Sequence, residues 1–328
     1  MGASSGPRVE KRRKGDVMTR AARLVEHGKP LEIQDVDLRE PGPDEVVVEL
    51  LFAGVNPIDR TLVEGRIATD APLPRTPGSE GSGRLEGKPV LVFSSALGTE
   101  RDGTWAEAVV VPREFVFDVP EGADMQEVAA MGVAGLTAWN VVNLAEVAKG
   151  DRVLVLGASG GVGLPVVGLA ASTGAAVWGQ TSSQDKAEAV RARGAERVVV
   201  TDAGGLADSI RDFRPTVVID PLGNGFTAVA LLAMQPLGRL VLFGTSAGAE
   251  ATLQLRELYR NRLCVFGYGG LRLTNEERRK GLEAALEALA SGHLRIPIGQ
   301  VWPLEDVNRA LDSLADRTVT GKAILQVR

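Results

Sequence analysis

The chain is poor in the residues that build disulfides and metal centres. Its 328 residues include one cysteine, Cys264, and two histidines. A lone cysteine forms no internal disulfide. A structural zinc site normally needs about four cysteine or histidine ligands, and a catalytic one about three protein ligands. The common zinc sites are therefore disfavoured, and only a site made of carboxylates stays open. Cys264 lies in an apolar stretch, so we expect it in the core.

Long apolar runs and an excess of positive charge are also missing. No window approaches ~20 uninterrupted apolar residues, so no membrane-spanning helix is expected. The net charge of −5 argues against nucleic acid and anionic membranes as partners. Apolar residues make up 44% and charged residues 24%, which is ordinary for a globular protein. We expect a cytoplasmic protein with a small-molecule substrate.

The first residues are basic but lack the apolar segment of a secretory signal. We interpret residues 1–19 as a flexible N-terminal extension, and a basic binding arm is the alternative. The length of the chain predicts two domains. The first half reads as mainly β, with a hairpin and further strands separated by turns. The expected hairpin strands are Ala22–Val25 and Leu31–Gln34, and the further strands are Glu45–Leu50, Pro89–Phe93 and Ala108–Val111.

Beyond about residue 127, short apolar strands alternate with helical patterns. This alternation predicts a doubly wound parallel sheet, and so an α/β fold overall. Two helical stripes and the strand Ala323–Val327 follow, and we expect this tail to pack on the N-terminal β domain. The six strands expected in the sheet are Val153–Leu156, Ala176–Trp178, Val198–Val200, Val217–Ile219, Leu240–Phe243 and Leu263–Phe266.

A strand, a glycine turn and the start of a helix follow one another at residues 153–163. Gly157, Gly160 and Gly163 have the spacing that lets a backbone approach a dinucleotide pyrophosphate at a helix N-terminus. A glycine turn without a ligand is the alternative. The residues predicted to bind the cofactor here are Ala158, Ser159, Gly160, Gly161, Val162 and Gly163.

The end of the second strand indicates which dinucleotide is bound. NAD-binding domains carry an acid there, ~20 residues beyond the glycines, for the ribose hydroxyls. This chain has the hydroxyls of Thr181, Ser182 and Ser183 instead, with Lys186 close behind. Hydroxyls and an ammonium attract a 2′-phosphate that an acid would repel. The sequence therefore favours NADPH, although Lys186 alone could be a solvated helix residue.

Several segments, in this order, resemble the zinc-independent medium-chain dehydrogenase/reductases of the quinone oxidoreductase and zeta-crystallin group. The resemblance implies a GroES-like β domain, built from residues 20–126 and 272–328, and a Rossmann NADPH domain at 127–271. Where zinc-dependent relatives have Gly-His-Glu, the chain reads Gly-Ser-Glu up to Glu80, which we read as structural. The matching segments are residues 54–59, 77–83, 103–107, 135–139, 157–163 and 321–325.

The same resemblance implies a set of site residues. Asn56 and Thr137 would line the nicotinamide pocket, with Asp59 in support. Many relatives carry a tyrosine, a candidate proton donor, where this chain has Thr61, preceded by Arg60. Arg60 and Arg66 could hold an anionic substrate or be surface charges. Segments after later strands would also touch the cofactor, unless they only pack in the sheet; these residues are Phe243, Gly244, Phe266 and Gly267.

These observations predict an NADPH-dependent, zinc-free reductase of a quinone or an activated C=C bond. A biosynthetic imine or enoyl-intermediate reductase is one alternative, and a non-catalytic NADPH-binding sensor or structural protein is another. The strand that contains Cys264 would end the sheet with an exposed apolar edge, which invites pairing with another chain. The resemblance points the same way, and we expect a homodimer through that strand.

Overall fold

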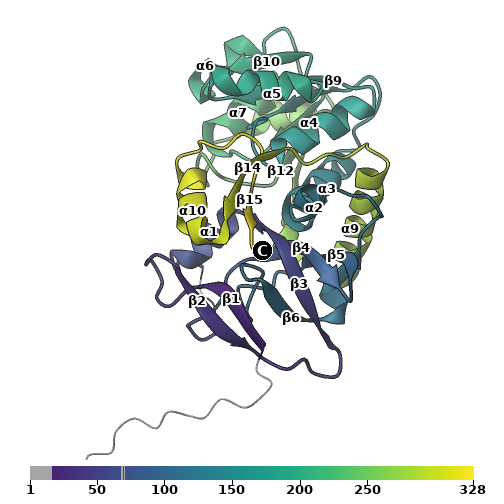
Figure 1. Ribbon diagram of the computed structural model, residues 1–328. Coiled ribbons are helices and arrows are strands. Elements are labelled where there is room, and N and C mark those ends of the chain that lie inside the picture. The colour runs from purple at the N-terminus through teal and green to yellow at the C-terminus, as the bar shows by residue number, and fades with distance from the viewer. Residues whose placement is uncertain (1–16, 68, 70) are drawn as a thin grey trace, which may run out of the picture.

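The computed structural model describes residues 17–328 except 68 and 70. Their strands form a hairpin, a mainly antiparallel sheet and a parallel sheet (Figure 1). In the hairpin, β1 (Val17–Arg23) pairs antiparallel with β2 (Glu32–Leu38), so the predicted hairpin is confirmed with shifted bounds. Residues 1–16 of the predicted N-terminal extension lie outside the residues that the structure describes.

Both ends of the chain build the seven-stranded mainly antiparallel sheet. Its order is β14-β15-β3-β4-β5-β7, with β6 also paired to β3. The C-terminal strands therefore return to the N-terminal half, as expected, and lie beside β3 (Figure 1). The bounds are β3 (Glu45–Val55), β4 (Glu80–Leu85), β5 (Lys88–Phe93), β6 (Ala108–Pro112), β7 (Val116–Asp118), β14 (Ile298–Pro303) and β15 (Lys322–Gln326).

Strand β4 is not among the strands predicted from the sequence. Its glycines resemble turn residues, yet they serve strand packing here. A Cβ on Gly83 would lie 2.1 Å from the carbonyl oxygen of Glu49, and one on Gly81 would lie 2.9 Å from that of Phe52. The pairing of β3 with β4 shifts register between Leu50 and Phe52. Glycine is needed because the backbones approach closely at this irregularity.

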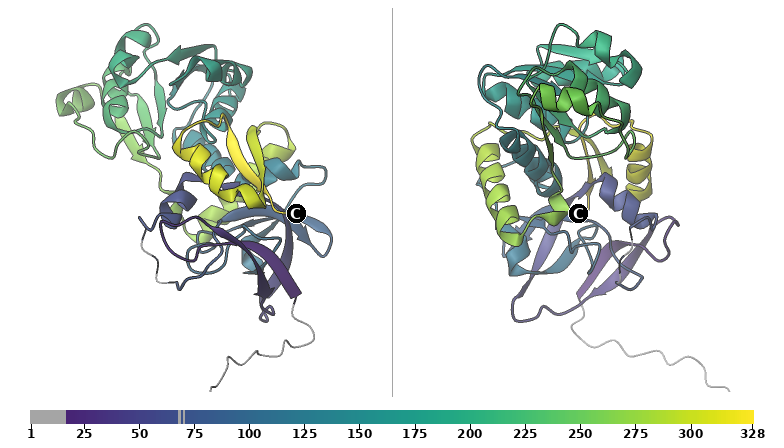
Figure 2. Two further views of the ribbon diagram at one scale, coloured as in Figure 1. Left: turned by 60° about the vertical axis from the view of Figure 1, so that its left-hand side comes forward. Right: turned by 180° about the vertical axis from the view of Figure 1, so that it is seen from behind.

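The predicted doubly wound sheet is present, with six parallel strands in the order β10-β9-β8-β11-β12-β13. Its strands are apolar because helices cover both faces (Figure 2). The strands are β8 (Arg152–Val155), β9 (Ala176–Thr181), β10 (Arg197–Val200), β11 (Val217–Asp220), β12 (Arg239–Leu242) and β13 (Cys264–Gly267). The connecting helices are α4 (Gly163–Ser172), α5 (Ala187–Ala192), α6 (Ala203–Ser209), α7 (Asn224–Ala233) and α8 (Leu255–Arg260).

Two helices flank the junction of the halves on opposite sides (Figure 1). One is α9 (Asn275–Ala290), which begins with a capping box, since Thr274 Oγ1 accepts the Glu277 N–H at 3.2 Å. Its apolar stripe joins the core that contains Val153 and Val155 of β8. The other is α10 (Val307–Ala315), whose Val307, Ala310 and Leu311 pack into the β-domain core.

The segment between the two sheets contains an irregular turn. α2 (Met125–Val128) is followed by the π-helical turn Met131–Gly135 and α3 (Leu136–Leu144). Gly135 donates its N–H to Ala130 O, five residues back, at 3.2 Å. A Cβ on Gly132 would lie 2.4 Å from the ring of Phe93, so glycine lets the turn press on the β domain. Such turns often occur at functional sites.

The prediction that Cys264 is buried is wrong. The cysteine is exposed because β13 is an edge strand, and its neighbour Val265 is 43% exposed.

In residues 17–328, apart from 68 and 70, no helix is long and apolar enough to cross a membrane.

Candidate functional site

A buried polar cluster lies where the glycine turn meets the β domain. Asn56 precedes the short helix α1 (Pro57–Val63), has extended φ and ψ, and is 3% exposed. Its Nδ2 donates to Glu80 Oε1 at 2.8 Å, and its Oδ1 accepts from Lys322 Nζ at 2.6 Å. Lys322 also donates to Glu80 Oε1 at 2.6 Å. We call Asn56, Asp59, Glu80 and Lys322 the amide cluster.

Glu80 is the hub of the amide cluster. It is fully buried, and its Oε2 accepts the backbone N–H of Val133, in the π-helical turn, at 2.8 Å. Thr104 Oγ1 donates to its backbone carbonyl at 2.7 Å. The carboxylate thus joins the start of the nucleotide domain to the β domain, in keeping with the structural reading of Glu80. A buried charge with such partners is satisfied rather than orphaned.

Asp59 supports Asn56 from within α1. Its Oδ2 accepts the backbone N–H of Asn56 at 2.8 Å, in a capping-box contact that fixes the approach to the helix. Burial raises the pKa of Asp59 to about 7, although the Asn56 N–H and the Lys322 charge oppose this. The Glu80 charge acts with burial. Asp59 positions Asn56 through the backbone.

The glycine turn has the close packing that its spacing predicts. Gly157 has φ 57°, in the left-handed region. A Cβ on Gly163 would lie 2.3 Å from Gly157 O, so only glycine lets α4 start this close to β8. A Cβ on Gly160 would meet one atom alone, Gly157 O at 3.3 Å. The turn therefore offers an open backbone surface that fits a pyrophosphate.

The side chains at the end of β9 and directly after it differ in how far they are used within the fold. Gln180 is structural, because its Oε1 accepts the Gly157 N–H at 3.0 Å and its Nε2 donates to Thr201 O at 2.6 Å. The Ser159 and Thr181 hydroxyls lie 3.0 Å apart, which joins the turn to the strand end. Ser182 is exposed and Ser183 half-buried. Ser182 and Ser183 are therefore the more accessible of the three predicted hydroxyls, whereas Thr181, 1% exposed, is held at the strand end.

Lys186 and Thr137 have partners from distant parts of the chain. Lys186 Nζ donates to the carbonyl of Arg317, in the C-terminal segment.

Thr137 is half-buried in the first turn of α3, near the hydroxyl of Tyr268. Asn140 Nδ2 donates to that hydroxyl at 3.1 Å. Burial raises the pKa of Tyr268, so its hydroxyl keeps its proton. The contact of Tyr268 with Asn140 was not predicted from the sequence, since the two residues lie 128 positions apart.

The other expected residues are more peripheral. Thr61 Oγ1 donates to Pro57 O at 3.0 Å inside α1. Arg60 Nε lies 2.8 Å from Glu64 Oε1, and Arg66 also pairs with Glu64, so both arginines are surface ion pairs. The last four predicted cofactor residues lie at strand ends of the parallel sheet; they are Phe243, Gly244, Phe266 and Gly267.

Lys322 is the residue that sequence reasoning missed. It matched the terminal family segment, but nothing local marks a strand lysine as buried. Its neighbour Gly321 donates to Ser159 O at 3.0 Å and forms a bridge with Gly160. A Cβ on Gly161 would lie 3.3 Å from Lys322 Cδ. The lysine stem therefore lies against the glycine turn while its ammonium reaches Asn56.

The described ranges, 17–67, 69 and 71–328, hold no group of three or more histidine, cysteine, aspartate or glutamate side chains able to bind a metal ion. In the amide cluster, the ammonium of Lys322 is the group that donates to both Asn56 and Glu80. An ammonium has no lone pair with which to ligate a metal.

Comparisons with known proteins agree with this architecture. Residues 42–121 match the family model "Alcohol dehydrogenase GroES-like domain", and residues 161–289 match "Zinc-binding dehydrogenase". The chain is 28% identical to quinone oxidoreductase-like protein 2 of Rattus norvegicus, over 94% of this chain and 92% of that protein. It is 30% identical to the synaptic vesicle membrane protein VAT-1 homolog of Homo sapiens, over 87% of this chain and 79% of that protein.

Solved structures give the same result for the fold. The quinone oxidoreductase from Thermus thermophilus, solved also in complex with NADPH, has a TM-score of 0.81 and 29% identity, covering 94% of this chain and 99% of that one. A structure described as an NAD-dependent alcohol dehydrogenase has a TM-score of 0.86 and 30% identity, covering 94% and 100%.

Proposed function

Because the chain belongs to the medium-chain dehydrogenase/reductases, in the quinone oxidoreductase group, and is an oxidoreductase of that family, we propose that it reduces a quinone or an activated C=C bond with NADPH and without zinc. The observation that carries the proposal is the amide cluster beside the glycine turn. Bound NADPH would supply the hydride, and the protein would supply placement and charge stabilisation.

The choice of NADPH over NADH rests on the end of β9. Ser182 and Ser183 offer hydroxyls at this position, just beyond the buried Thr181, where NAD-specific domains carry an acid. Lys186 lies behind them with a carbonyl partner and no acid within ion-pair distance among the described residues. Its charge is therefore available to a 2′-phosphate.

The absence of zinc is proposed from the donor set around Asn56. A zinc ligand set needs nitrogen, sulfur or carboxylate donors converging on one point. Here Glu80 Oε1 already accepts from both Asn56 and Lys322. Metal analysis of purified protein tests this proposal, and stoichiometric zinc that supports turnover would overturn it.

Two groups are candidates for the other two tasks, which are to hold the substrate oxygen and to supply a proton. The second amide N–H of Asn56 can hold a substrate oxygen, and the protonated hydroxyl of Tyr268 can return a proton to the product. Thr61 is unsuited because its hydroxyl is used within α1. Hydride addition to the β-carbon of an enone would leave an enolate, and protonation of that enolate completes the reduction.

The experiment is NADPH oxidation, followed at fixed enzyme concentration with quinones, enones, enoyl thioesters and imines in turn. Turnover with a quinone or an enone supports the proposal. Tight NADPH binding without turnover on any acceptor would instead favour the sensor or structural alternative. Faster oxidation of NADH than of NADPH would overturn the cofactor assignment.

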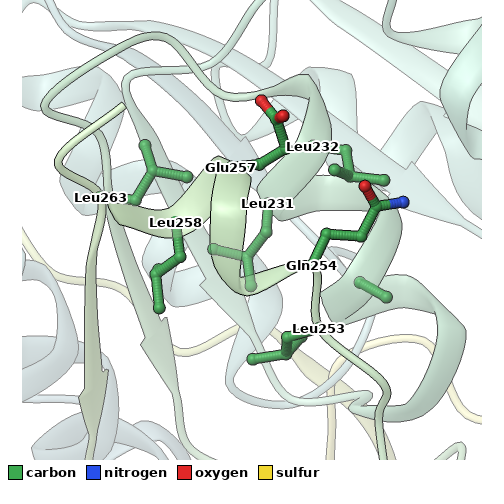
Figure 3. A pocket seen from close by; sticks show the side chains of 8 residues that line it. Leu231, Leu232, Leu253, Gln254, Glu257, Leu258 and Leu263 are labelled. Carbon is green, nitrogen blue, oxygen red and sulfur yellow. The ribbon is translucent and has the colours of Figure 1, made fainter. Parts of the chain in front are cut away.

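We further propose a homodimer formed through β13. Val265 on that edge is exposed, as are Leu255 and Tyr259 of the neighbouring α8. A small apolar pocket is lined by residues of α7, of α8 and of the segments before α8 and β13 (Figure 3); they are Ala228, Leu231, Leu232, Leu253, Gln254, Glu257, Leu258 and Leu263. Pairing of two edges would cover these side chains.

The cytoplasmic location stays a prediction.

A further inference from the structure

Lys322 is a buried cation with a fixed set of partners. The residue is 4% exposed, and lysine is almost never this buried unless it is paired. Two of its three N–H donors reach Asn56 Oδ1 and Glu80 Oε1, each at 2.6 Å. Its ammonium therefore contacts both the side chain proposed to face the substrate and the carboxylate to which that side chain donates.

These partners determine which way the Asn56 amide points. An ammonium can only donate and a carboxylate can only accept. The amide oxygen must then face Lys322 and the amide nitrogen must face Glu80, which is the arrangement observed. A reversed amide would set N–H against N–H and oxygen against oxygen. The Asn56 amide nitrogen carries two N–H donors, and Glu80 takes one of them, which leaves the second for a ligand oxygen.

The backbone that carries Lys322 is held by the glycine turn. Gly321 donates to Ser159 O at 3.0 Å, and Lys322 donates its backbone N–H to Pro297 O at 2.8 Å. Gly321 has φ 87°, and a Cβ there would lie 2.5 Å from Pro297 O, so only glycine fits. The start of β15 is thus fixed between the cofactor-binding turn and the β domain.

We infer that Lys322 is a positioning residue that fixes the Asn56 amide as an N–H donor, and that the site is built for acceptors with a carbonyl oxygen. This inference rests on the proposed function and deepens it. A carbonyl oxygen that gains negative charge as hydride adds would be stabilised by that N–H and by the ammonium behind it. A protonated imine has neither a free lone pair nor negative charge, and both groups would oppose it.

The kinetic test uses Lys322→Met, Lys322→Arg and the exposed control Lys280→Met. We expect Lys322→Met to lower kcat on an enone by about 10²-fold, the effect of losing one oriented donor. The Kd for NADPH should change little, because the link to the turn is made by backbone. Lys322→Arg should recover part of kcat, since a guanidinium can donate to both partners. Unchanged kcat in Lys322→Met would overturn the inference.

A double-mutant cycle separates positioning from a general effect of charge. If Lys322 acts through Asn56, then Lys322→Met should cost no further kcat in an Asn56→Ala background. If the losses of kcat multiply in Lys322→Met with Asn56→Ala, the positioning role is overturned. Lys322→Met alone leaves Glu80 as an unpaired buried charge and could unfold the chain. Lys322→Met with Glu80→Gln removes both charges and should fold while keeping the loss of kcat; a folded double variant with normal kcat would contradict the inference.

A spectroscopic arm does not depend on turnover. The side-chain amide protons of Asn56 can be assigned by their loss in Asn56→Ala, and their exchange with water can be measured in the full chain. We expect slow exchange in the wild type and exchange at least about tenfold faster in Lys322→Met with Glu80→Gln, because the charged acceptor of the Asn56 N–H becomes neutral and the amide is no longer held by Lys322. Equal exchange rates in the wild type and in this variant would overturn the orientation argument, whether or not any acceptor is reduced. If only the proposed function fails, NADPH is not oxidised but the exchange rate still differs between the two proteins.

The substrate class is tested by paired acceptors. An enone and a cyclic imine of similar size are compared in the wild type, and the enone should be reduced faster. In Lys322→Met the ratio of the two rates should move towards the imine. An imine reduced as fast as the enone by the wild type would overturn the assignment of the substrate class.

Discussion

Gly54 lies directly beneath the carboxylate of Glu80, where a Cβ on Gly54 would come within 2.2 Å of Glu80 Oε1. The backbone carbonyl of Gly54 also accepts from Trp105 Nε1 at 3.0 Å, which holds the strand in place. The strand cannot easily retreat, so any side chain at position 54 must displace Glu80. The orientation of Asn56 depends on Glu80 and therefore on this glycine.

Gly54→Ala should reduce both stability and turnover. Overpacking of a buried site typically costs about 1–3 kcal/mol, and the displaced carboxylate would release Asn56. Urea unfolding and kcat with a fixed acceptor measure the two effects. Gly204→Ala, at an exposed position of α6, is the control and should be neutral or slightly stabilising. A Gly54→Ala variant with normal kcat would show that Glu80 does not govern the site.

Lys186→Gln should weaken the preference for NADPH over NADH. A charged hydrogen bond to a phosphate contributes about 1.5–3 kcal/mol, so the ratio of kcat/KM values should fall by about tenfold or more. Values of kcat/KM for the two cofactors, with one acceptor, give the ratio. Lys280→Gln removes an exposed lysine that pairs with Glu276 and should leave the ratio unchanged. An unaltered ratio in Lys186→Gln would remove this residue from the cofactor site.

The success and failure of sequence reasoning have physical causes. The parallel strands were predictable because each is a short buried apolar run between helical patterns, and the glycine turn and Asn56 lie within local motifs. Strand β4 was missed because Gly81 and Gly83 look like turn residues. The burial of Cys264 was predicted wrongly because an apolar strand at a sheet edge has the same pattern as one in the middle.

The amide cluster itself could not be read from local patterns. Lys322 lies 266 residues from Asn56 and 242 from Glu80 in the chain. A lysine at the start of a strand usually faces solvent, and only the return of the C-terminal segment to β3 buries this one. Likewise, the nearness of Tyr268 to Thr137 depends on how the parallel sheet packs on α3.

Tyr268→Phe should lower kcat while leaving NADPH binding intact. The ring would keep its packing, but the proton that the hydroxyl can donate would be lost, and general acids typically contribute about 10²–10⁴-fold. Single-turnover rates with saturating NADPH report the effect. Tyr259→Phe, on the exposed face of α8, is the matched control. If Tyr268→Phe turns over normally, the proton comes from water or from another group.

Val265→Lys should produce a monomer if the chain pairs through β13. A charge at a sheet edge opposes edge-to-edge pairing. Light scattering at micromolar concentration measures the mass of the wild type and the variant. Val200→Lys places the same charge on β10, the opposite edge of the same sheet, and should not change the mass. A monomeric wild type, or a Val265→Lys variant that is still dimeric, would contradict the proposal.

Asp59 should give the protein a stability that falls as pH rises from about 4 to about 7. Its pKa is raised from 3.8 to about 7 in the folded state, chiefly by burial, with Lys322 and Glu80 as the charges that face it. Between these values the folded state holds a proton that the unfolded state has released, so stability decreases with rising pH and is level above about 7. Asp59→Asn keeps an acceptor for the Asn56 N–H and should remove this slope in urea unfolding. Glu45→Gln is the control of opposite sign, because the hydrogen bond from Arg39 lowers the pKa of Glu45 to about 2, which confines its effect to lower pH. A slope that persists in Asp59→Asn would assign the titration to another buried group.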